Sequence, residues 1–265
     1  MSILAAFAVP HPPLIVPEVG RGEERVIQKT IDAYHSVAQA VSRLAPETVI
    51  VVSPHATCYR DYIHISPGAG ARGDFARFGV AEVAARAAYD EDFAGALAEA
   101  AASLPAGLEG ETDPELDHGV LIPLYFLNAV YRAYKLVRVG ISALPPSAHH
   151  ALGRLIGDTA VKLDRRAVFI ASGDLSHRLL ASGPYGFHPS GPRFDAWAAE
   201  NIRTGAVENF LNPDEDLCAE AAECGLRPLQ VLTGVLDGLN FTSELLSYEG
   251  PFGVGYAVAS FEPEA

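Results

Sequence analysis

The segment Ile3-Leu-Ala-Ala-Phe-Ala-Val9, followed at once by Pro10-His11-Pro12-Pro13, decides the predicted fold of this chain. A nearly continuous apolar run of this length is typical of a strand that is buried on both faces of a sheet. In open α/β sheets, ligands bind outside the carboxyl ends of the strands, where the proline-flanked His11 would lie. The segment therefore predicts a buried strand with a functional site beside its end.

Two later segments repeat this arrangement. Residues 48–53 lead into Pro54-His55, and residues 167–171 lead into the turn Asp174-Leu-Ser-His177. Neutral imidazole is a common protein ligand for iron, zinc and copper. Because three strand ends direct histidines toward one crevice, the pattern predicts a metal enzyme.

Strand-like and helix-like segments alternate along the rest of the chain, without an evident repeat or linker. We therefore expect residues 1–265 to form a single α/β domain with a central mixed β-sheet flanked by helices. The glycine-rich residues 67–79 are predicted to be a loop, and a helix is expected over 215–237. Further strands are expected near 61–66, 136–141, 242–247 and 253–261, and further helices near 23–44, 90–104, 120–132, 147–163, 191–204 and 205–211.

Composition and charge exclude several classes of protein. The chain has 19 basic and 33 acidic residues and a net charge of −14, which argues against binding to nucleic acid or to an anionic membrane. Its apolar stretches are shorter than the roughly 18 residues of a membrane-spanning helix, and its start lacks the features of a signal peptide. Its three cysteines contain no CxxC pair, so we expect a cytoplasmic protein. Apolar segments 120–132 and 226–236 suggest a possible homo-oligomer.

Further candidate site residues follow from the positions of polar side chains at predicted turns. His118 follows Asp117 at the start of a predicted helix. A third metal ligand is expected from Glu223, Cys224 or Glu249, each of which lies near a break between elements. Asp174 is a candidate for orienting a histidine or, alternatively, for a helix-capping role.

The order of these motifs resembles the class III extradiol ring-cleavage dioxygenases. It is similar to the catalytic subunit of protocatechuate 4,5-dioxygenase and extends to the related Memo proteins, over nearly the whole chain. The matching motifs are His11, His55, Asp117-His118-Gly119, Ser172-Gly-Asp-Leu-Ser-His177 and Glu223-Cys224-Gly225.

This resemblance implies an Fe(II) site of two histidines and one carboxylate, with Zn or Cu as alternative metals. His11, His55 and Glu223 would be the metal ligands. The substrate would be a small aromatic diol or an aminophenol. O₂ would cleave the aromatic ring of this substrate beside its hydroxyl groups. His177 would take a proton from the substrate and later return one, and His118 would hydrogen-bond the substrate. Asp174 would support His177 as a further catalytic residue.

The resemblance leaves the third ligand open. Memo proteins carry a cysteine where the dioxygenases carry the glutamate, and this chain has both residues side by side. Adjacent helical residues point about 100° apart, so only one of them should face the metal. We favour Glu223 over Cys224, with Glu249 third. The alternative functions are a Memo-like protein that binds a metal or a partner without ring cleavage, and a zinc hydrolase. Arg60, Arg178 and Arg227 are the candidates for binding a substrate carboxylate.

Overall fold

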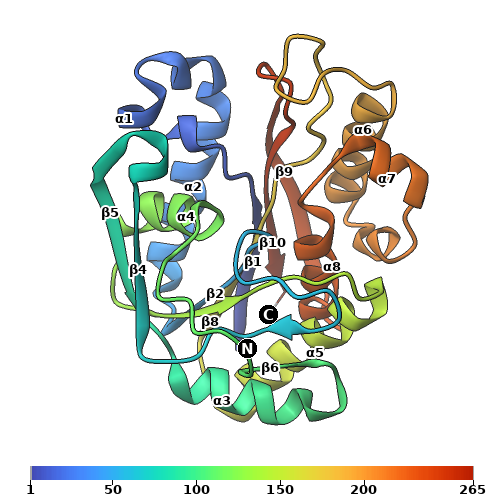
Figure 1. Ribbon diagram of the computed structural model, residues 1–265. Helices are drawn as coiled ribbons and strands as arrows, with labels where there is room; N and C mark the ends of the chain where they lie inside the picture. Colours follow the sequence, from blue (N-terminus) through green and yellow to red (C-terminus); the bar gives the residue numbers. More distant parts are fainter. Residues whose placement is uncertain (1, 265) are drawn as a thin grey trace.

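A computed structural model describes residues 2–264 of the chain and places a six-stranded mixed sheet at its centre (Figure 1). The strands are β1 (Ile3–Val9), β2 (Thr48–Val52), β7 (Lys135–Val139), β8 (Ala167–Ser172), β9 (Phe241–Glu249) and β10 (Tyr256–Pro263). Their order is β7-β2-β8-β1-β10-β9. The first four are parallel, whereas β10 is antiparallel to β1 and to β9. The predicted single-domain α/β class with a mixed sheet is confirmed.

Helices cover both faces of this sheet, which explains why β1, β2 and β8 are almost entirely apolar. The helices are α1 (Pro17–Gly20), α2 (Gln28–Leu44), α3 (Glu91–Ala100), α4 (His118–Asn128), α5 (Pro146–Lys162), α6 (Ser190–Thr204), α7 (Glu215–Ala221) and α8 (Leu226–Val235). Because strand side chains alternate between faces, Phe7 and Val9 pack in the layer with α2 and α4, whereas Ala6 and Ala8 pack in the layer with α3, α5, α6 and α8. Figure 1 shows α2 and α4 on one side of the sheet and α5, α6 and α8 on the other.

The strand order brings the histidine-bearing loops together. β2, β8 and β1 are neighbouring parallel strands, so their carboxyl ends share one edge of the sheet. At that edge Val9 pairs with Ser172, and Val52 pairs with Ala171. The loops that carry His11, His55 and His177 therefore leave the sheet beside one another.

The prediction of a loop over residues 67–79 is wrong. Much of this segment is β4 (Gly70–Phe75), which a 3₁₀ turn, Ala76–Phe78, joins to the antiparallel strand β5 (Val80–Ala88). The glycines suggest a loop in the sequence, but Gly73 is a strand residue that is glycine because the chain packs closely against it. A Cβ atom on Gly73 would lie 2.5 Å from the carbonyl oxygen of Leu116. The predicted strand near 61–66 is shorter, β3 (Ile63–His64), and pairs with β6 (Ala106–Gly107).

The predicted helix over 215–237 is divided into α7 and α8. The chain leaves α7 at Ala222, which has a left-handed backbone with φ of 54°. The Glu223 carboxylate then accepts a hydrogen bond of 2.6 Å from the Leu226 N–H and caps α8. The break carries Cys224 to the edge of the sheet where the three loops meet. The predicted helix over 205–211 is a 3₁₀ turn, Val207–Leu211.

The two apolar segments that suggested an oligomer are mostly in the interior, apart from the end of the first, where Val130 is exposed. Val120, Ile122 and Leu124 of α4 are buried, and α8 packs closely against α5. These segments therefore give no support to an oligomer. No helix within residues 2–264 has both the length and the apolar composition needed to cross a bilayer.

Candidate metal centre and active site

His11 lies shortly after β1 and is buried, and both its backbone and its ring are hydrogen-bonded. Its backbone N–H donates to the Asp174 carboxylate at 2.8 Å, and its Nδ1 lies 3.0 Å from the Ser172 hydroxyl. That hydroxyl donates its proton to the Gly119 carbonyl at 2.6 Å, so it must accept a proton from His11. The proton of the neutral ring is therefore on Nδ1, and Nε2 presents its lone pair, as a metal-binding histidine requires.

His55 and His118 complete a group of three imidazoles. The Nε2 atoms of His55 and His11 are 3.0 Å apart, and the His55 ring stacks on that of His118 at 4.1 Å. One ring nitrogen from each of the three histidines lies within 4.8 Å of the others. Burial lowers the pKa of His11 and of His118 to about 3, and it also lowers the pKa of His55. All three rings are therefore neutral at pH 7, and this donor set fits Fe(II), Zn or Cu.

Asp117 ties two of these histidines to the scaffold. It caps α4 by accepting from the Val120 N–H at 3.2 Å, and α4 begins with His118. It also accepts from the Ser53 hydroxyl at 2.6 Å, and the same hydroxyl accepts from the His55 N–H at 3.2 Å. Arg138 of β7 donates to the second Asp117 oxygen at 2.9 Å. The Asp117 carboxylate thus fixes the positions of the backbone at His55 and at His118.

Arg138 is a functional support that the sequence reasoning missed. It is fully buried and also bonds to the carbonyls of Asp113 and Glu115 and to the Asp113 carboxylate. A lone arginine inside the apolar strand Leu136-Val137-Arg138-Val139 was the available signal, because a buried charge requires partners.

Cys224 belongs to a second group of possible ligands, with His11 and Asp174. Its Sγ lies 3.5 Å from His11 Nε2, and it accepts a 3.2 Å hydrogen bond from the Asp174 N–H. Burial raises the pKa of the Cys224 thiol and raises that of Asp174 to about 6. A soft sulfur donor therefore lies beside the most buried imidazole of the site.

The two candidate glutamates lie elsewhere. The Glu223 carboxylate caps α8, and its burial raises its pKa to about 7. The Glu249 carboxylate accepts from the N–H and the hydroxyl of Thr30 at 2.8 and 2.7 Å. Neither belongs to the groups of possible ligands found in residues 2–264. Glu223 as a ligand stays a prediction, and the geometry around His11 favours Cys224.

The loop after β8 and the break before α8 cross at very short range. A Cβ atom on Gly173 would lie 2.3 Å from the Gly225 Cα, and one on Gly225 would lie 2.9 Å from the Asp174 carbonyl oxygen. Both positions therefore require glycine, whatever their backbone angles. This glycine crossing holds Asp174 and Cys224 side by side.

His177 is prepared to accept a proton. Its Nδ1 donates to the Ala222 carbonyl oxygen, so in the neutral ring Nε2 carries the lone pair. This Nε2 lies 3.9 Å from the Asp174 carboxylate, which would stabilise the protonated ring. The Ser176 N–H donates to Asp195 at 2.7 Å and fixes the turn, and the Tyr185 ring lies against His177 at 5.0 Å.

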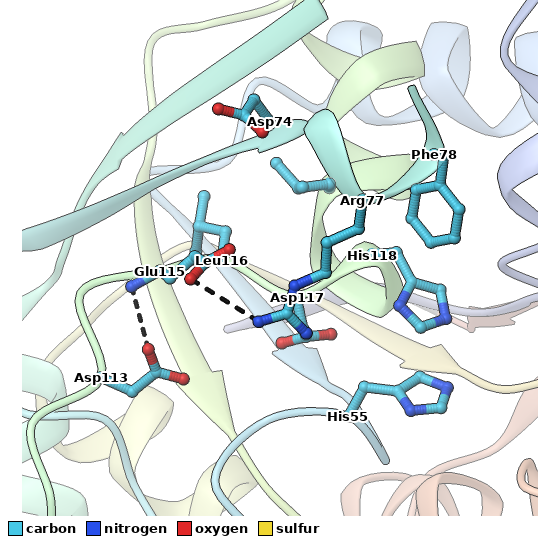
Figure 2. A pocket seen from close by; sticks show the side chains of 10 residues that line it. His55, Asp74, Arg77, Phe78, Asp113, Glu115, Leu116, Asp117 and His118 are labelled. Atoms are coloured by element: carbon cyan, nitrogen blue, oxygen red, sulfur yellow. Dashed lines mark hydrogen bonds and ion pairs between the residues drawn. The ribbon is translucent and has the colours of Figure 1, made fainter. Parts of the chain in front are cut away.

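A cavity of about 300 Å³ opens beside the imidazoles (Figure 2). Its walls carry four carboxylates and one arginine, Arg77. Figure 2 shows His55 and His118 together, with Phe78 near His118 and Arg77 reaching toward Glu115. The predicted Arg60, Arg178 and Arg227 do not line this cavity. The full lining is His55, Asp74, Arg77, Phe78, Asp113, Glu115, Leu116, Asp117, His118 and Leu121.

Known proteins resemble this chain over most of its length. It is 39% identical to protein CA_C1420 of Clostridium acetobutylicum, and the match covers 99% of this chain and 58% of that protein. It is 28% identical to a 2,3-dihydroxyphenylpropionate/2,3-dihydroxicinnamic acid 1,2-dioxygenase of a Rhodococcus species, over 88% of this chain and 70% of that enzyme. The chain thus spans little more than half the length of its Clostridium relative.

The fold also occurs in a solved structure, the uncharacterized protein JW3007 from Escherichia coli K12. The two chains superpose with a TM-score of 0.62 at 17% identity, over 98% of this chain and 99% of the other. The model of one protein family, described as the catalytic LigB subunit of aromatic ring-opening dioxygenase, matches residues 5–259. The chain therefore belongs to the LigB family of aromatic ring-opening dioxygenases.

Proposed function

We propose that this protein is a non-heme Fe(II)-dependent extradiol dioxygenase that cleaves a catechol-like diol or an aminophenol with O₂. The observation that carries the proposal is the pair of neutral imidazoles His11 and His55, with Nε2 atoms 3.0 Å apart, beside a prepared base, His177. Family membership and the dioxygenases among the relatives support the same reaction class.

His11 and His55 would hold the metal, and a third ligand would come from Glu223 or from Cys224, which lies with His11 in one group of possible ligands. When bound, Fe(II) supplies the Lewis acidity and the one-electron chemistry with O₂ that protein side chains lack. The residues of the chain supply positioning and proton transfer. His177 Nε2 takes a hydroxyl proton from the substrate, and Asp174 stabilises the resulting imidazolium. The neutral His118 ring hydrogen-bonds a substrate oxygen at the cavity wall.

The first test replaces His177 with alanine. We expect the rate of O₂ uptake with a catechol to fall by roughly 10²–10⁴-fold, because a positioned acid–base group contributes that much. Iron content should stay at the wild-type level, since His177 belongs to neither group of possible ligands. The measurements are oxygen-electrode rates and iron per chain after anaerobic loading.

The matched control is His35→Ala, which removes an exposed histidine from α2 and should leave both values unchanged. Wild-type rates in the His177 variant would refute its assigned role. A wild-type protein that takes up no O₂ with any of a panel of catechols and aminophenols would refute the proposed function.

One observation favours a second candidate, a Memo-like metal-binding or partner-binding protein without ring cleavage. The Cys224 thiol beside His11 suits Cu(I) or Zn better than Fe(II). Two variants show which of the two candidate residues, Cys224 or Glu223, is the third metal ligand. If Cys224 is the third ligand, Cys224→Ser should weaken metal binding by at least tenfold, whereas Glu223→Gln should preserve it and loosen the α8 cap. Metal competition titrations measure both effects, and the reverse order would establish Glu223.

The charge of the cavity predicts a preference among substrates. Four carboxylates against Arg77 make the walls acidic, even with Arg138 paired to Asp113 and Asp117. A catechol carrying an ammonium group should therefore bind several-fold more tightly than the same ring carrying a carboxylate. Anaerobic titration of the Fe(II)-loaded protein measures this ratio, which should fall in Asp74→Asn and in high salt. A preference for the carboxylate would show that Arg77 dominates the cavity instead.

A further inference from the structure

The β4–β5 hairpin at the left margin of Figure 1 has one covered edge and one free edge. Residues 114–116 cover β4, because the Arg72 N–H donates to the Pro114 carbonyl at 2.9 Å and the Leu116 N–H donates to the Arg72 carbonyl at 2.8 Å. Among the described residues, β5 pairs with β4 alone, at Val80 and over residues 84–88. Within residues 2–264, the backbone of 81–87 makes no hydrogen bond outside this hairpin. β5 therefore presents a free strand edge.

The register shows which backbone groups face outward. Arg72 directs both of its backbone groups toward residues 114–116, so its pair with Arg86 is a non-hydrogen-bonded pair. Arg86 therefore directs its own N–H and C=O away from β4, and Ala84, which pairs with Asp74 two residues along, does the same. Beyond Ala84 the pairing is irregular, and β5 pairs with β4 again only at Val80, so Glu82 lies in a bulge. The side chains of Glu82, Ala84 and Arg86 are exposed, whereas Val83 packs toward the core.

This edge carries charges that lack counterions within the chain. Arg72 and Arg86 stand directly opposite each other on the exposed face of the hairpin, which is an unfavourable like-charge pair. In the part of the chain that the structure describes, neither arginine forms an ion pair, and Glu82 forms none either. An acid on the far side of the free edge would supply a counterion for Arg86.

A second copy of the same strand supplies that acid. In an antiparallel pair with its two-fold axis at Ala84, Glu82 faces Arg86 of the partner subunit, and the converse pair forms at the other end. Ala84, whose backbone groups face outward, then forms a hydrogen-bonded pair with Ala84 of the partner subunit at the axis. The strand Val80-Ala-Glu-Val-Ala-Ala-Arg-Ala-Ala88 has a bulge between Val80 and Ala84 but lacks the prolines and lysines that also protect free edges from pairing.

We propose that β5 is a dimerisation edge, through which two copies of this chain form one continuous four-stranded sheet. The occupant is a second copy because the strand complements itself in both hydrogen bonding and charge. A strand pair of this length buries less than a standard interface, so the dimer should be weak and dependent on concentration. The hairpin also carries Arg77 and Phe78 to the cavity wall, so dimerisation would brace that wall.

Sedimentation velocity over a wide concentration range tests the proposal by a charge swap. Glu82→Arg opposes two arginines at each end of the strand pair, and Arg86→Glu opposes two glutamates. Each should raise the dimer dissociation constant by about tenfold or more at low salt. The double variant Glu82→Arg/Arg86→Glu restores complementary charges and should return the constant to within a few-fold of wild type. Glu99→Arg, an exposed change of equal charge on α3, is the control and should have no effect.

A backbone variant tests the edge itself. The Ala84 N–H faces away from β4, so Ala84→Pro removes a donor that only the partner subunit would use. It should abolish the dimer while far-ultraviolet circular dichroism shows a folded chain. A wild-type protein that stays monomeric at the highest concentration overturns the proposal. A wild-type dimer that neither the single swaps nor Ala84→Pro weaken also overturns it, because another face would then mediate association.

Discussion

Replacing His11 with alanine is expected to reduce the bound metal to background. His11 is the residue shared by both groups of possible ligands, and its Nε2 is the atom that faces His55 and Cys224. Its ring is held in position, because His11 is buried and its Nδ1 is hydrogen-bonded to Ser172. Metal per chain after anaerobic loading and desalting measures the effect, and all metal-dependent activity should disappear with the metal.

A graded series gives this prediction its control. Ser172→Ala leaves the imidazole in place but removes the acceptor that sets its tautomer. Losing such a supporting hydrogen bond typically weakens metal affinity by about 10–100-fold, so this variant should fall between wild type and His11→Ala. Circular dichroism of both metal-free variants should match that of the wild type. A His11→Ala protein that retains one metal ion per chain would move the metal site away from the end of β1.

Replacing Arg138 with methionine is expected to destabilise the fold by about 3–5 kcal/mol, because the change leaves a buried carboxylate without its cation. The Arg138 side chain is 0% exposed and its partner Asp117 is 10% exposed, so solvent cannot replace the lost charge. Chemical denaturation measures the free energy of unfolding. The variant should also bind metal more weakly, since Asp117 positions both His55 and His118.

The comparison variant is Arg77→Met, which removes an arginine whose ion pair with Glu115 is 81% and 61% exposed. Exposed pairs contribute little, so its unfolding free energy should stay within about 0.5 kcal/mol of wild type. Adding Asp117→Asn to Arg138→Met should recover part of the loss, because it neutralises the unpaired carboxylate. A similar small effect for both arginine variants would show that Asp117 does not depend on Arg138.

The sequence predicts the strands that are buried on both faces of the sheet. β1, β2 and β8 lie between helical layers and are apolar except for Thr48 and Ser172 at strand ends, so their patterns identify them and the histidines that follow them. The β4–β5 hairpin was not predicted, because Gly73 is required by contact with Leu116, which is distant in sequence. The break expected near Glu223 and Cys224 is present between α7 and α8, but no glycine marks the left-handed residue Ala222 at which it begins.

The sequence predicts the site residues that come shortly after buried strands, such as His11 and His55. Glu223 and Cys224 are adjacent in the sequence, and the sequence does not show that the Glu223 carboxylate is the group that caps α8. Arg138 and Asp117 come from separate segments, and only the folded chain reveals that they pair. Arg77 at the cavity wall was missed for the same reason as the hairpin that carries it.

The glycine crossing of residues 173 and 225 has a consequence for attempts to redesign this protein. One loop contributes Asp174 and His177, and the other contributes Cys224 and the carbonyl that orients His177. With no space for a side chain between them, the two backbones must shift together. An engineer who alters metal preference through residues 222–225 will therefore also alter proton transfer, and libraries that vary both loops at once have the better prospect of a working enzyme.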